Sequence, residues 1–535
     1  MFLDHRPGVR GLLRAGVATL ALGTAGVATA QELVIAMPAS NEPASLDGHI
    51  DPYQSTWLMN SFISDPLVVL SPEGEYLPGL ATDWSVSDNG TEWTFTLREG
   101  VSFQDGTPFD AEAVRFNLAR IIDPETASAQ LASDVGPIAE IEVTGSHSLT
   151  LHYDTPWVTL LDGLRRTPMW SPTAVEQVSS ADFDKNLVGT GPFRLSEWVQ
   201  NDHVTLERWD EYGGWHPLQD HEGPANVETV TLQFIGEEAV LGQILQTGEA
   251  DVAYTVPPLF LDFYQDNPEY DLVSKGQAGT GLQMVMNIRT PPLDDVRVRR
   301  ALLHGKDADA VNDILYDGLY GESDGPLNNI HACYWEGAEE MYPHDTERAR
   351  ELLQEAGWVD DGSDVRKAEG VAGVEDGTAL EVRWSVLHHQ AIGEVAQAQY
   401  RDIGVDLQVE VIPGPVQLDM VQRRDFELIY ERQRSPQPLI LDQVWNSKWD
   451  EPGGWAWTGY ENPELDGLLD QLRSIPGAEA RCDVARDVQE IIMENALMVP
   501  TLSQPVYIAM DESVDGFQIG AEGNWFFLHN VSIAE

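Results

Sequence analysis

The sequence has few cysteines, few positive charges and no long apolar segment after residue 30. Only two of the 535 residues are cysteine, Cys333 and Cys482, which excludes a cysteine-rich disulfide framework. No CxxC pair or paired histidine spacing accompanies them, so we expect neither a metal site nor a bound cofactor. Beyond residue 30 no stretch approaches the roughly 18 apolar residues that a membrane-spanning helix requires. We therefore expect the exported protein to be soluble.

Charge of one sign dominates the chain. Lys and Arg number 31 against 88 Asp and Glu, which gives a formal net charge of −57. Such a field repels phosphate backbones and anionic membranes, so we expect no nucleic-acid partner. The acidic residues are scattered through the chain rather than gathered in one tail, which indicates a solvated acidic surface on a folded protein.

One hypothesis is that this acidity is an adaptation to high salt, because screening weakens the repulsion among surface carboxylates. On that hypothesis, molar salt raises the melting temperature of the purified protein. Thermal unfolding measured across a salt series checks this, and a melting temperature that does not rise in molar salt would contradict it.

The first 30 residues have the pattern of a signal peptide. An apolar run at 15–27 is followed by Ala-Thr-Ala at 28–30, a cleavage signal before Gln31. The arginines that precede the apolar run are Arg6, Arg10 and Arg14. No cysteine lies near the cleavage site, so a lipid anchor is not expected. The pattern predicts a periplasmic protein, cleaved between Ala30 and Gln31.

Length and composition predict more than one domain. A chain of 535 residues is longer than a single hydrophobic core usually supports. The apolar share of 42% is ordinary for a globular protein, so large cores can form.

The most informative stretch lies between residues 80 and 120. It reads LATDW at 80–84, WTFTLREGV at 93–101 and FQDGTPFDA at 103–111. Alternation of Trp93, Phe95 and Leu97 with polar residues predicts a strand with one buried face. Asp110 stands at the N-cap of a predicted helix, where its carboxylate can accept a backbone N–H.

Three further stretches follow in a fixed order. They read GTGPF at 189–193, PPLDDVRVRRA at 291–301 and DTERARELLQEAGW at 345–358. Together with the stretch at 80–111 they resemble the solute-binding proteins of ABC importers. The resemblance is to the peptide/nickel-type class, family 5 of the bacterial extracellular solute-binding proteins, and it covers most of the mature chain.

The resemblance implies an α/β fold with two lobes, of the type II periplasmic-binding-protein class. Mixed sheets flanked by helices are expected in each lobe, joined by hinge strands near 284–287 and 498–504. We expect lobe one at 32–283 plus 499–535, with an extra subdomain at about 71–188, and lobe two at 284–498.

The implied function is capture of a solute in the periplasm and delivery to the permease subunits of an ABC importer. Short peptides are the first expectation for the solute. An oligosaccharide, an opine-like conjugate and a metal chelate remain open as alternatives. We expect the protein to be a monomer.

Loops that face the cleft in relatives supply the first candidate ligand contacts. Glu42 lies in a loop that resembles the first loop of the family, and His388 follows a predicted strand. Tyr430 ends another strand, and its loop carries Arg432 and Arg434 where peptide-binding relatives carry an acid. Two guanidinium groups suit a carboxylate, a phosphate or a sugar hydroxyl. Ion pairing with surface acids is the alternative reading.

Aromatic residues are dense just after this loop. Trp445, Trp455 and Trp457 can stack on a sugar, an aromatic side chain or a cation. Packing in the core is the alternative, and we expect it to claim at least half of these rings.

The sequence gives little indication of a catalytic site. Residues 321–325 spell GxSxG, but a nucleophile elbow needs a strand before the serine and a helix after it. Here a helical pattern precedes Ser323. A secreted hydrolase is therefore a remote alternative, and we expect no catalytic residue.

The two cysteines fall in predicted lobe two. Export permits a disulfide between Cys333 and Cys482, which requires Cα atoms within about 7 Å. A disulfide and two buried thiols both remain open.

Overall fold

The computed structural model describes residues 31–51, 53–126, 128–387, 390–450, 454–475 and 477–534. The predicted signal peptide, residues 1–30, and the candidate ligand residue His388 lie outside these ranges. Gln31–Glu535 forms one compact unit. Within the described ranges, no helix has both the length and the apolar character needed to cross a membrane.

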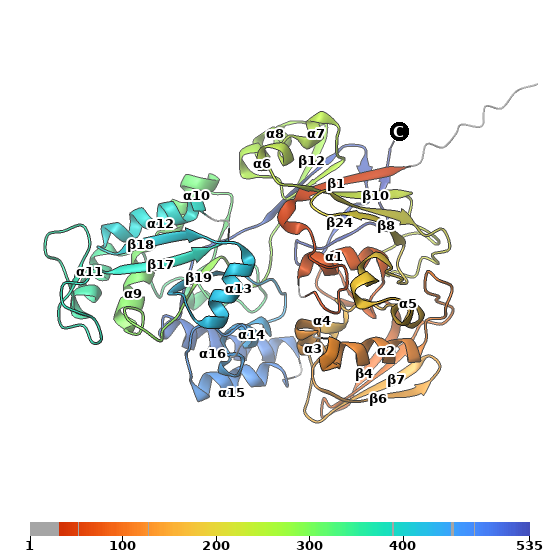
Figure 1. Ribbon diagram of the computed structural model, residues 1–535, viewed down its shortest axis with the longest axis horizontal. Coiled ribbons are helices and arrows are strands. Elements are labelled where there is room, and N and C mark those ends of the chain that lie inside the picture. The colour runs from red at the N-terminus through yellow and green to blue at the C-terminus, as the bar shows by residue number, and fades with distance from the viewer. Residues whose placement is uncertain are drawn as a thin grey trace, which may run out of the picture. The chain divides into compact units, whose positions relative to one another are not determined.

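A mixed sheet of seven strands contains the first strand of the described chain and a strand from its C-terminal part (Figure 1). In spatial order its strands are β12 (Tyr270–Lys275), β22 (Val506–Asp511), β11 (Val252–Tyr254), β1 (Glu32–Pro38), β10 (Thr229–Ile235), β9 (His203–Arg208) and β8 (Phe193–Val199). Strand β1 is parallel to its neighbours β10 and β11, whereas the other neighbouring pairs are antiparallel.

A second mixed sheet has five strands. In spatial order they are β18 (Asp406–Val411), β17 (Glu381–Val386), β19 (Leu428–Glu431), β13 (Gln283–Met286) and β20 (Met498–Pro500). Strands β18, β17 and β19 run parallel, and β13 is antiparallel to both β19 and β20. Helix α12 (Gln390–Asp402) packs against β18 (Figure 1).

A four-stranded antiparallel sheet forms within residues 81–153. Its order is β4 (Ala81–Val86), β5 (Glu92–Leu97), β7 (Ser148–Tyr153) and β6 (Ile138–Gly145). The predicted alternation is confirmed, because Trp93, Phe95 and Leu97 are buried and the residues between them are exposed. The predicted helix cap is also confirmed. Asp110 accepts a 3.0 Å hydrogen bond from Ala113 N at the start of α2, Ala111–Ile122.

The remaining helices flank these sheets. Those before residue 280 are α1 (Gln54–Ile63), α3 (Ala129–Val135), α4 (Leu160–Leu164), α5 (Pro172–Gln177), α6 (Glu238–Leu241), α7 (Ile244–Thr247) and α8 (Leu261–Asp266). Those after it are α9 (Val296–Gly305), α10 (Ala308–Tyr316), α11 (Thr346–Glu355), α13 (Gly414–Arg423), α14 (Ile440–Trp445), α15 (Pro463–Leu472) and α16 (Ala478–Glu494).

Apolar side chains form two large clusters. One draws on residues from 33 to 254 and from 506 to 531, around the seven-stranded and four-stranded sheets. The other draws on residues from 282 to 502, around the five-stranded sheet. Because burial of apolar area drives folding, the five-stranded sheet has a source of stability separate from the one that the other two sheets share. The architecture is the predicted mixed α/β fold.

The structure joins the two cysteines in a disulfide. Cys482 lies in α16, and Cys333 lies in the loop before a short 3₁₀ helix at Glu336–Ala338. Their Cα atoms are 4.7 Å apart. Gln489, about two turns further along α16, donates a 2.8 Å hydrogen bond to the carbonyl of Cys333. The loop is therefore held to the helix by a covalent and a polar link.

Candidate functional site

The chain crosses between the two large sheets twice, and the two crossing segments lie side by side. Residues 276–282 connect β12 with β13, and residues 501–505 connect β20 with β22. Leu282 N donates to Leu502 O at 2.7 Å, and Thr501 N donates to Leu282 O at 2.8 Å. Any movement of one sheet relative to the other has to bend these two segments.

The loop after β19 is fixed to the first crossing. Thr280 N donates to Gln433 O at 2.9 Å, and Gln433 N donates to Thr280 Oγ1 at 2.7 Å. A Cβ atom at Gly279 would lie 2.2 Å from Gln433 O, so this close approach requires glycine. The backbone that carries the two candidate arginines is therefore held in place on both sides.

Arg432 lies in a group of tyrosines that comes from several parts of the chain. Its Nη1 donates to Gln504 Oε1, and Gln504 Nε2 donates to the hydroxyl of Tyr320 at 3.0 Å. The ring of Tyr320 stacks on that of Tyr316, with centroids 3.8 Å apart. We call this group the hinge cluster, and its members are Tyr254, Tyr316, Tyr320, Tyr430, Arg432 and Gln504.

The phenols of the hinge cluster are neutral. Burial raises the pKa of Tyr254, Tyr320 and Tyr430, and the charge of Arg432 offsets part of each rise. Burial also raises the pKa of Tyr316 to about 12. The cluster therefore combines one guanidinium with hydroxyl and amide groups against aromatic walls, a composition typical of a binding site for a polar solute.

Arg434 lies on the same loop after β19 as Arg432, and it forms a hydrogen bond with a different neutral side chain. Its Nε donates to Gln277 Oε1 at 3.0 Å. In the described parts of the chain, neither Arg432 nor Arg434 forms an ion pair with a carboxylate. Both side chains are half-buried. A guanidinium has five N–H donors, so most of the donors on this loop remain available to solvent or to a solute.

Glu431 adds an acidic group that faces inward at the start of the loop. Its side chain is 3% exposed, and Oε2 accepts hydrogen bonds from Gln283 Nε2 and from Thr280 Oγ1 at 3.3 Å. Oε1 has no hydrogen-bond partner among the described residues. Burial raises the pKa of Glu431 to about 7 because a charged carboxylate is poorly solvated there. Protonated and ionised forms therefore coexist near neutral pH.

The candidate tryptophans are largely packed. Trp445 is 2% exposed and Trp457 5% exposed, and both belong to the apolar cluster around the five-stranded sheet. Trp455 is half-buried, and its ring stacks on Trp457 with centroids 5.2 Å apart. The packing alternative therefore accounts for Trp445 and Trp457, and Trp455 is the ring with an accessible face.

Glu42 has a local role in the structure. Its Oε1 accepts a 2.8 Å hydrogen bond from Asn201 N, in the turn between β8 and β9. This contact joins two loops at one edge of the seven-stranded sheet. Ligand contact by Glu42 stays a prediction.

Ser323 is not in a nucleophile elbow. It follows a two-residue strand, β14 (Gly321–Glu322), and the next described helix is the 3₁₀ turn at Glu336–Ala338. The hydroxyl is buried and has no hydrogen-bond partner among the described residues. A nucleophilic serine needs an adjacent base, and no such contact is formed here.

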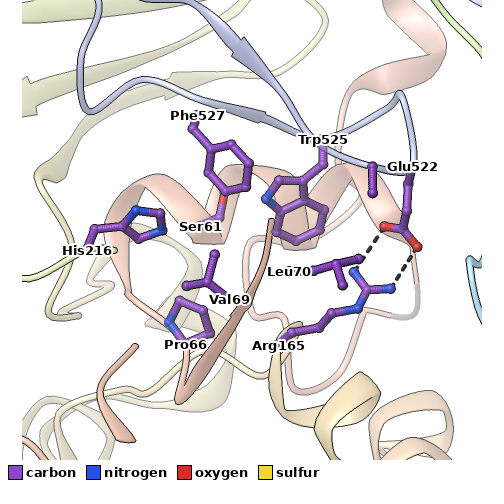
Figure 2. A pocket seen from close by; sticks show the side chains of 11 residues that line it. Ser61, Pro66, Val69, Leu70, Arg165, His216, Glu522, Trp525 and Phe527 are labelled. Atoms are coloured by element: carbon purple, nitrogen blue, oxygen red, sulfur yellow. Dashed lines mark hydrogen bonds and ion pairs between the residues drawn. The ribbon is translucent and has the colours of Figure 1, made fainter. Parts of the chain in front are cut away.

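A small cavity lies beside the seven-stranded sheet rather than at the crossings. Arg165, His216, Glu522 and Trp525 line part of it (Figure 2), and Arg165 Nη2 lies 2.7 Å from Glu522 Oε1. Its volume is about 30 Å³, whereas pockets for drug-sized ligands measure roughly 300–1,000 Å³. The cavity holds a few water molecules at most, so it cannot hold a peptide.

Sequence reasoning identified Tyr430 and Arg432 of the hinge cluster, and Arg434 beside it, but missed the other members of the cluster. Helix α10 ends at Tyr316, so the stacking of Tyr316 on Tyr320 depends on the turn that follows the helix and not on helical spacing. Gln504 and Tyr254 carry no local signal, because only the fold brings them to the loop of Arg432.

Comparison with known proteins identifies the family. Residues 75–438 match "Bacterial extracellular solute-binding proteins, family 5 Middle". The chain is 25% identical to the glutathione-binding protein GsiB of Escherichia coli (strain K12), over 97% of each protein. Its fold is similar to that of the ABC transporter-associated periplasmic binding protein DppA from Helicobacter pylori in complex with peptide STSA. That match has a TM-score of 0.80 and 20% identity, and it covers 94% of this chain and 98% of the other. The fold is also similar to NikA from Brucella suis in complex with Fe(III)-EDTA, with a TM-score of 0.79 and 21% identity over 94% and 99% of the two chains.

Proposed function

Because the chain belongs to family 5 of the bacterial extracellular solute-binding proteins, it is a substrate-binding protein of ABC transport, and we propose that its solute is a short peptide. The similar Escherichia coli protein is named for glutathione, and the Helicobacter pylori protein holds a peptide. A metal chelate is the second candidate, since the Brucella suis protein holds Fe(III)-EDTA. Peptides, glutathione and EDTA all carry carboxylates.

The observation that carries the peptide proposal is the loop of Arg432 and Arg434. Both arginines have neutral partners, Gln504 and Gln277, in a chain with a net charge of −57. A solute carboxylate fits such a loop, because guanidinium groups bind carboxylates with paired donors. An oligosaccharide or an opine-like conjugate would use the same donors through hydroxyl or carboxylate groups. Mass spectrometry of the ligand retained after native purification distinguishes these solutes.

The proposed action is closure of two lobes on the solute. The lobes are residues 32–283 with 499–535, which include a subdomain at about 71–188, and residues 284–498. Separate sheets and separate apolar clusters support this division. Closure bends the two crossing segments, and the closed form is what the permease subunits of an ABC importer would receive. We further propose that the protein works as a monomer in the periplasm, after cleavage between Ala30 and Gln31.

Saturating solute is expected to reduce the radius of gyration and to raise the melting temperature. Closure makes the protein more compact, and a ligand at 100 times its dissociation constant stabilises the native state by about 2.7 kcal/mol. Small-angle scattering and thermal unfolding, with and without the solute recovered by mass spectrometry, measure both effects. A bound solute that leaves the radius of gyration unchanged would rule out the closure proposal.

The alternative of a secreted hydrolase makes an opposite prediction. A substrate-binding protein retains its peptide intact, so no product appears during prolonged incubation. Chromatography of the peptide after incubation with the wild type and with Ser323→Ala is the measurement. Hydrolysis by the wild type that disappears in Ser323→Ala would overturn the proposal in favour of the hydrolase.

A further inference from the structure

Three buried side chains with metal-ligating atoms meet away from the hinge cluster. Asp65 follows α1, His216 lies in the loop after β9, and His529 follows a short strand, β25 (Phe526–Phe527). Their exposed fractions are 1%, 5% and 3%. One carboxylate oxygen and one ring nitrogen from each histidine lie within 4.8 Å of one another. We call these three residues the DHH cluster.

Asp65 is oriented so that one of its oxygens faces the histidines without a partner. Oδ2 accepts hydrogen bonds from Trp215 Nε1 at 2.6 Å and from the hydroxyl of Tyr212 at 3.1 Å. Oδ1 has no hydrogen-bond partner among the described residues. A buried oxygen without a partner loses solvation that nothing replaces. Metal-binding carboxylates are commonly held in this way, with one oxygen bound by protein donors and the other free for the ion.

His529 is unpartnered on both ring nitrogens. Within the described part of the chain, neither Nδ1 nor Nε2 forms a hydrogen bond. Nε2 lies 3.8 Å from Asp65 Oδ1, which exceeds the roughly 2.7–3.2 Å of a hydrogen bond. Zinc–ligand bonds of about 2.0–2.1 Å can span up to roughly 4.1 Å between two ligand atoms. The separation is therefore one that a bridging ion fits and a direct hydrogen bond does not.

His216 completes the group. Its ring stacks on that of His529, with centroids 3.9 Å apart and an angle of 16° between the planes. Among the described residues, the hydrogen bond that its Nδ1 receives is a long one of 3.4 Å from Leu218 N. Two protonated imidazoles would repel each other strongly at this distance in a buried site, whereas neutral imidazoles are the form that binds metal ions.

We propose that Asp65, His216 and His529 bind one divalent transition metal ion, with Zn²⁺ as the best match. Two imidazoles and one carboxylate are a donor set for zinc and its neighbours, whereas Mg²⁺ and Ca²⁺ prefer oxygen ligands alone. Ligand atoms around a tetrahedral zinc ion lie roughly 3.4 Å apart, so the three atoms have to approach by on the order of 1 Å. The two stacked rings also have to rotate out of their parallel arrangement, because an imidazole nitrogen binds an ion in the plane of its ring, and the broad terminal torsion of histidine permits this rotation.

A fourth ligand is available from the cavity. His216 lines it together with Pro66 and Phe527, which are close in sequence to Asp65 and His529 (Figure 2). A volume of about 30 Å³ accommodates water. A water molecule in the cavity lies beside His216, and the proposal assigns the fourth coordination position to such a water.

The ion would join three segments that are far apart in the sequence. Asp65, His216 and His529 come from the first strands and helices, the middle and the C-terminal part of the chain. A resident ion there stabilises the fold of the seven-stranded sheet region by mass action. This role is separate from transport of a metal chelate, because the DHH cluster shares no residue with the hinge cluster. The sequence did not predict this metal site, because the three ligands lack the close, regular spacing that marks many metal sites.

Metal content of the mature protein, residues 31–535, tests the proposal. The protein is stripped with a chelator, dialysed against ZnCl₂ and then against metal-free buffer, and its zinc is measured by mass spectrometry. We expect about one tightly bound ion per wild-type chain and a higher melting temperature in the loaded form. Co²⁺ added to the stripped protein should give the absorption bands of a four- or five-coordinate site.

His529→Gln is the test variant, because glutamine preserves size and polarity without an imidazole. It should weaken Zn²⁺ binding by at least 100-fold and abolish the zinc-dependent rise in melting temperature. His152→Ala is the matched control, since His152 lies at the surface 3.1 Å from Glu142 and 3.5 Å from Glu92. This variant should bind zinc as the wild type does.

Two results would overturn the proposal. One is a wild-type protein that retains no stoichiometric zinc and shows no cobalt bands, which leaves ordered water as the partner of the unpaired atoms. The other is zinc that is retained by His529→Gln but lost in His152→Ala, which assigns binding to the surface. Should His529→Gln fail to fold, the stoichiometry and cobalt spectrum of the wild type still decide between a metal site and none.

Discussion

Replacing both cysteines with serine is expected to lower the free energy of unfolding by about 3–5 kcal/mol. Cys333 and Cys482 are separated by 149 residues. Closing a loop of this length restricts the unfolded chain, and the chain-entropy relation gives about 5 kcal/mol for it. The estimate is an upper value, since structure that persists in the unfolded chain reduces it. Urea unfolding of the oxidised wild type and the double variant, monitored by tryptophan fluorescence, measures the difference.

Reduction provides the control for this prediction. Dithiothreitol should shift the wild-type transition to that of the Cys333→Ser/Cys482→Ser variant and leave the variant unchanged. Solute affinity should change little in either case, because the disulfide joins α16 to a loop and contributes no residue to the hinge cluster. Equal stability of the oxidised wild type and the variant would show that the bond does not constrain the unfolded chain.

The double variant Arg432→Ala/Arg434→Ala is expected to lose most of its affinity for the native solute. A single substitution, Arg434→Ala, should cost on the order of 2–4 kcal/mol in binding free energy, because a buried solute charge loses its partner. The free energy of unfolding should hardly change, since both side chains bind neutral glutamines and lie outside the core. Isothermal titration calorimetry with the solute recovered from the native protein measures the affinity.

Arg423→Ala is the matched control for the arginine variants. Arg423 lies at the exposed end of α13, where it pairs with Asp419, and such surface pairs contribute little to stability. Its removal should leave both affinity and stability unchanged. A dissociation constant for the double variant equal to that of the wild type would show that Arg432 and Arg434 do not bind the solute.

Local patterns predicted much of the secondary structure correctly. Alternation at residues 93–97 predicted β5, and the carboxylate of Asp110 caps α2 as its position indicated. The segment at 238–247 instead forms two short helices, α6 and α7, where helical character in the sequence is continuous. Between them a Cβ atom at Gly242 would lie 2.1 Å from the ring of Phe260. That contact is made through space, and no pattern in the helix itself reveals it.

The sequence by itself determined the family, through the motifs at 80–111, 189–193, 291–301 and 345–358, and the resemblance implied the mixed α/β class. It also determined single local elements such as β5 and the cap of α2, because strand alternation and helix caps depend on neighbouring residues. Only the tertiary structure decided how distant residues meet. It joined Cys333 to Cys482, packed Trp445 and Trp457 into the core, and brought Gln504 and the tyrosines to Arg432. It also brought Asp65, His216 and His529 within reach of one ion. Distances of this kind result from the packing of sheets and helices as whole units, so the local spacing of residues does not predict them.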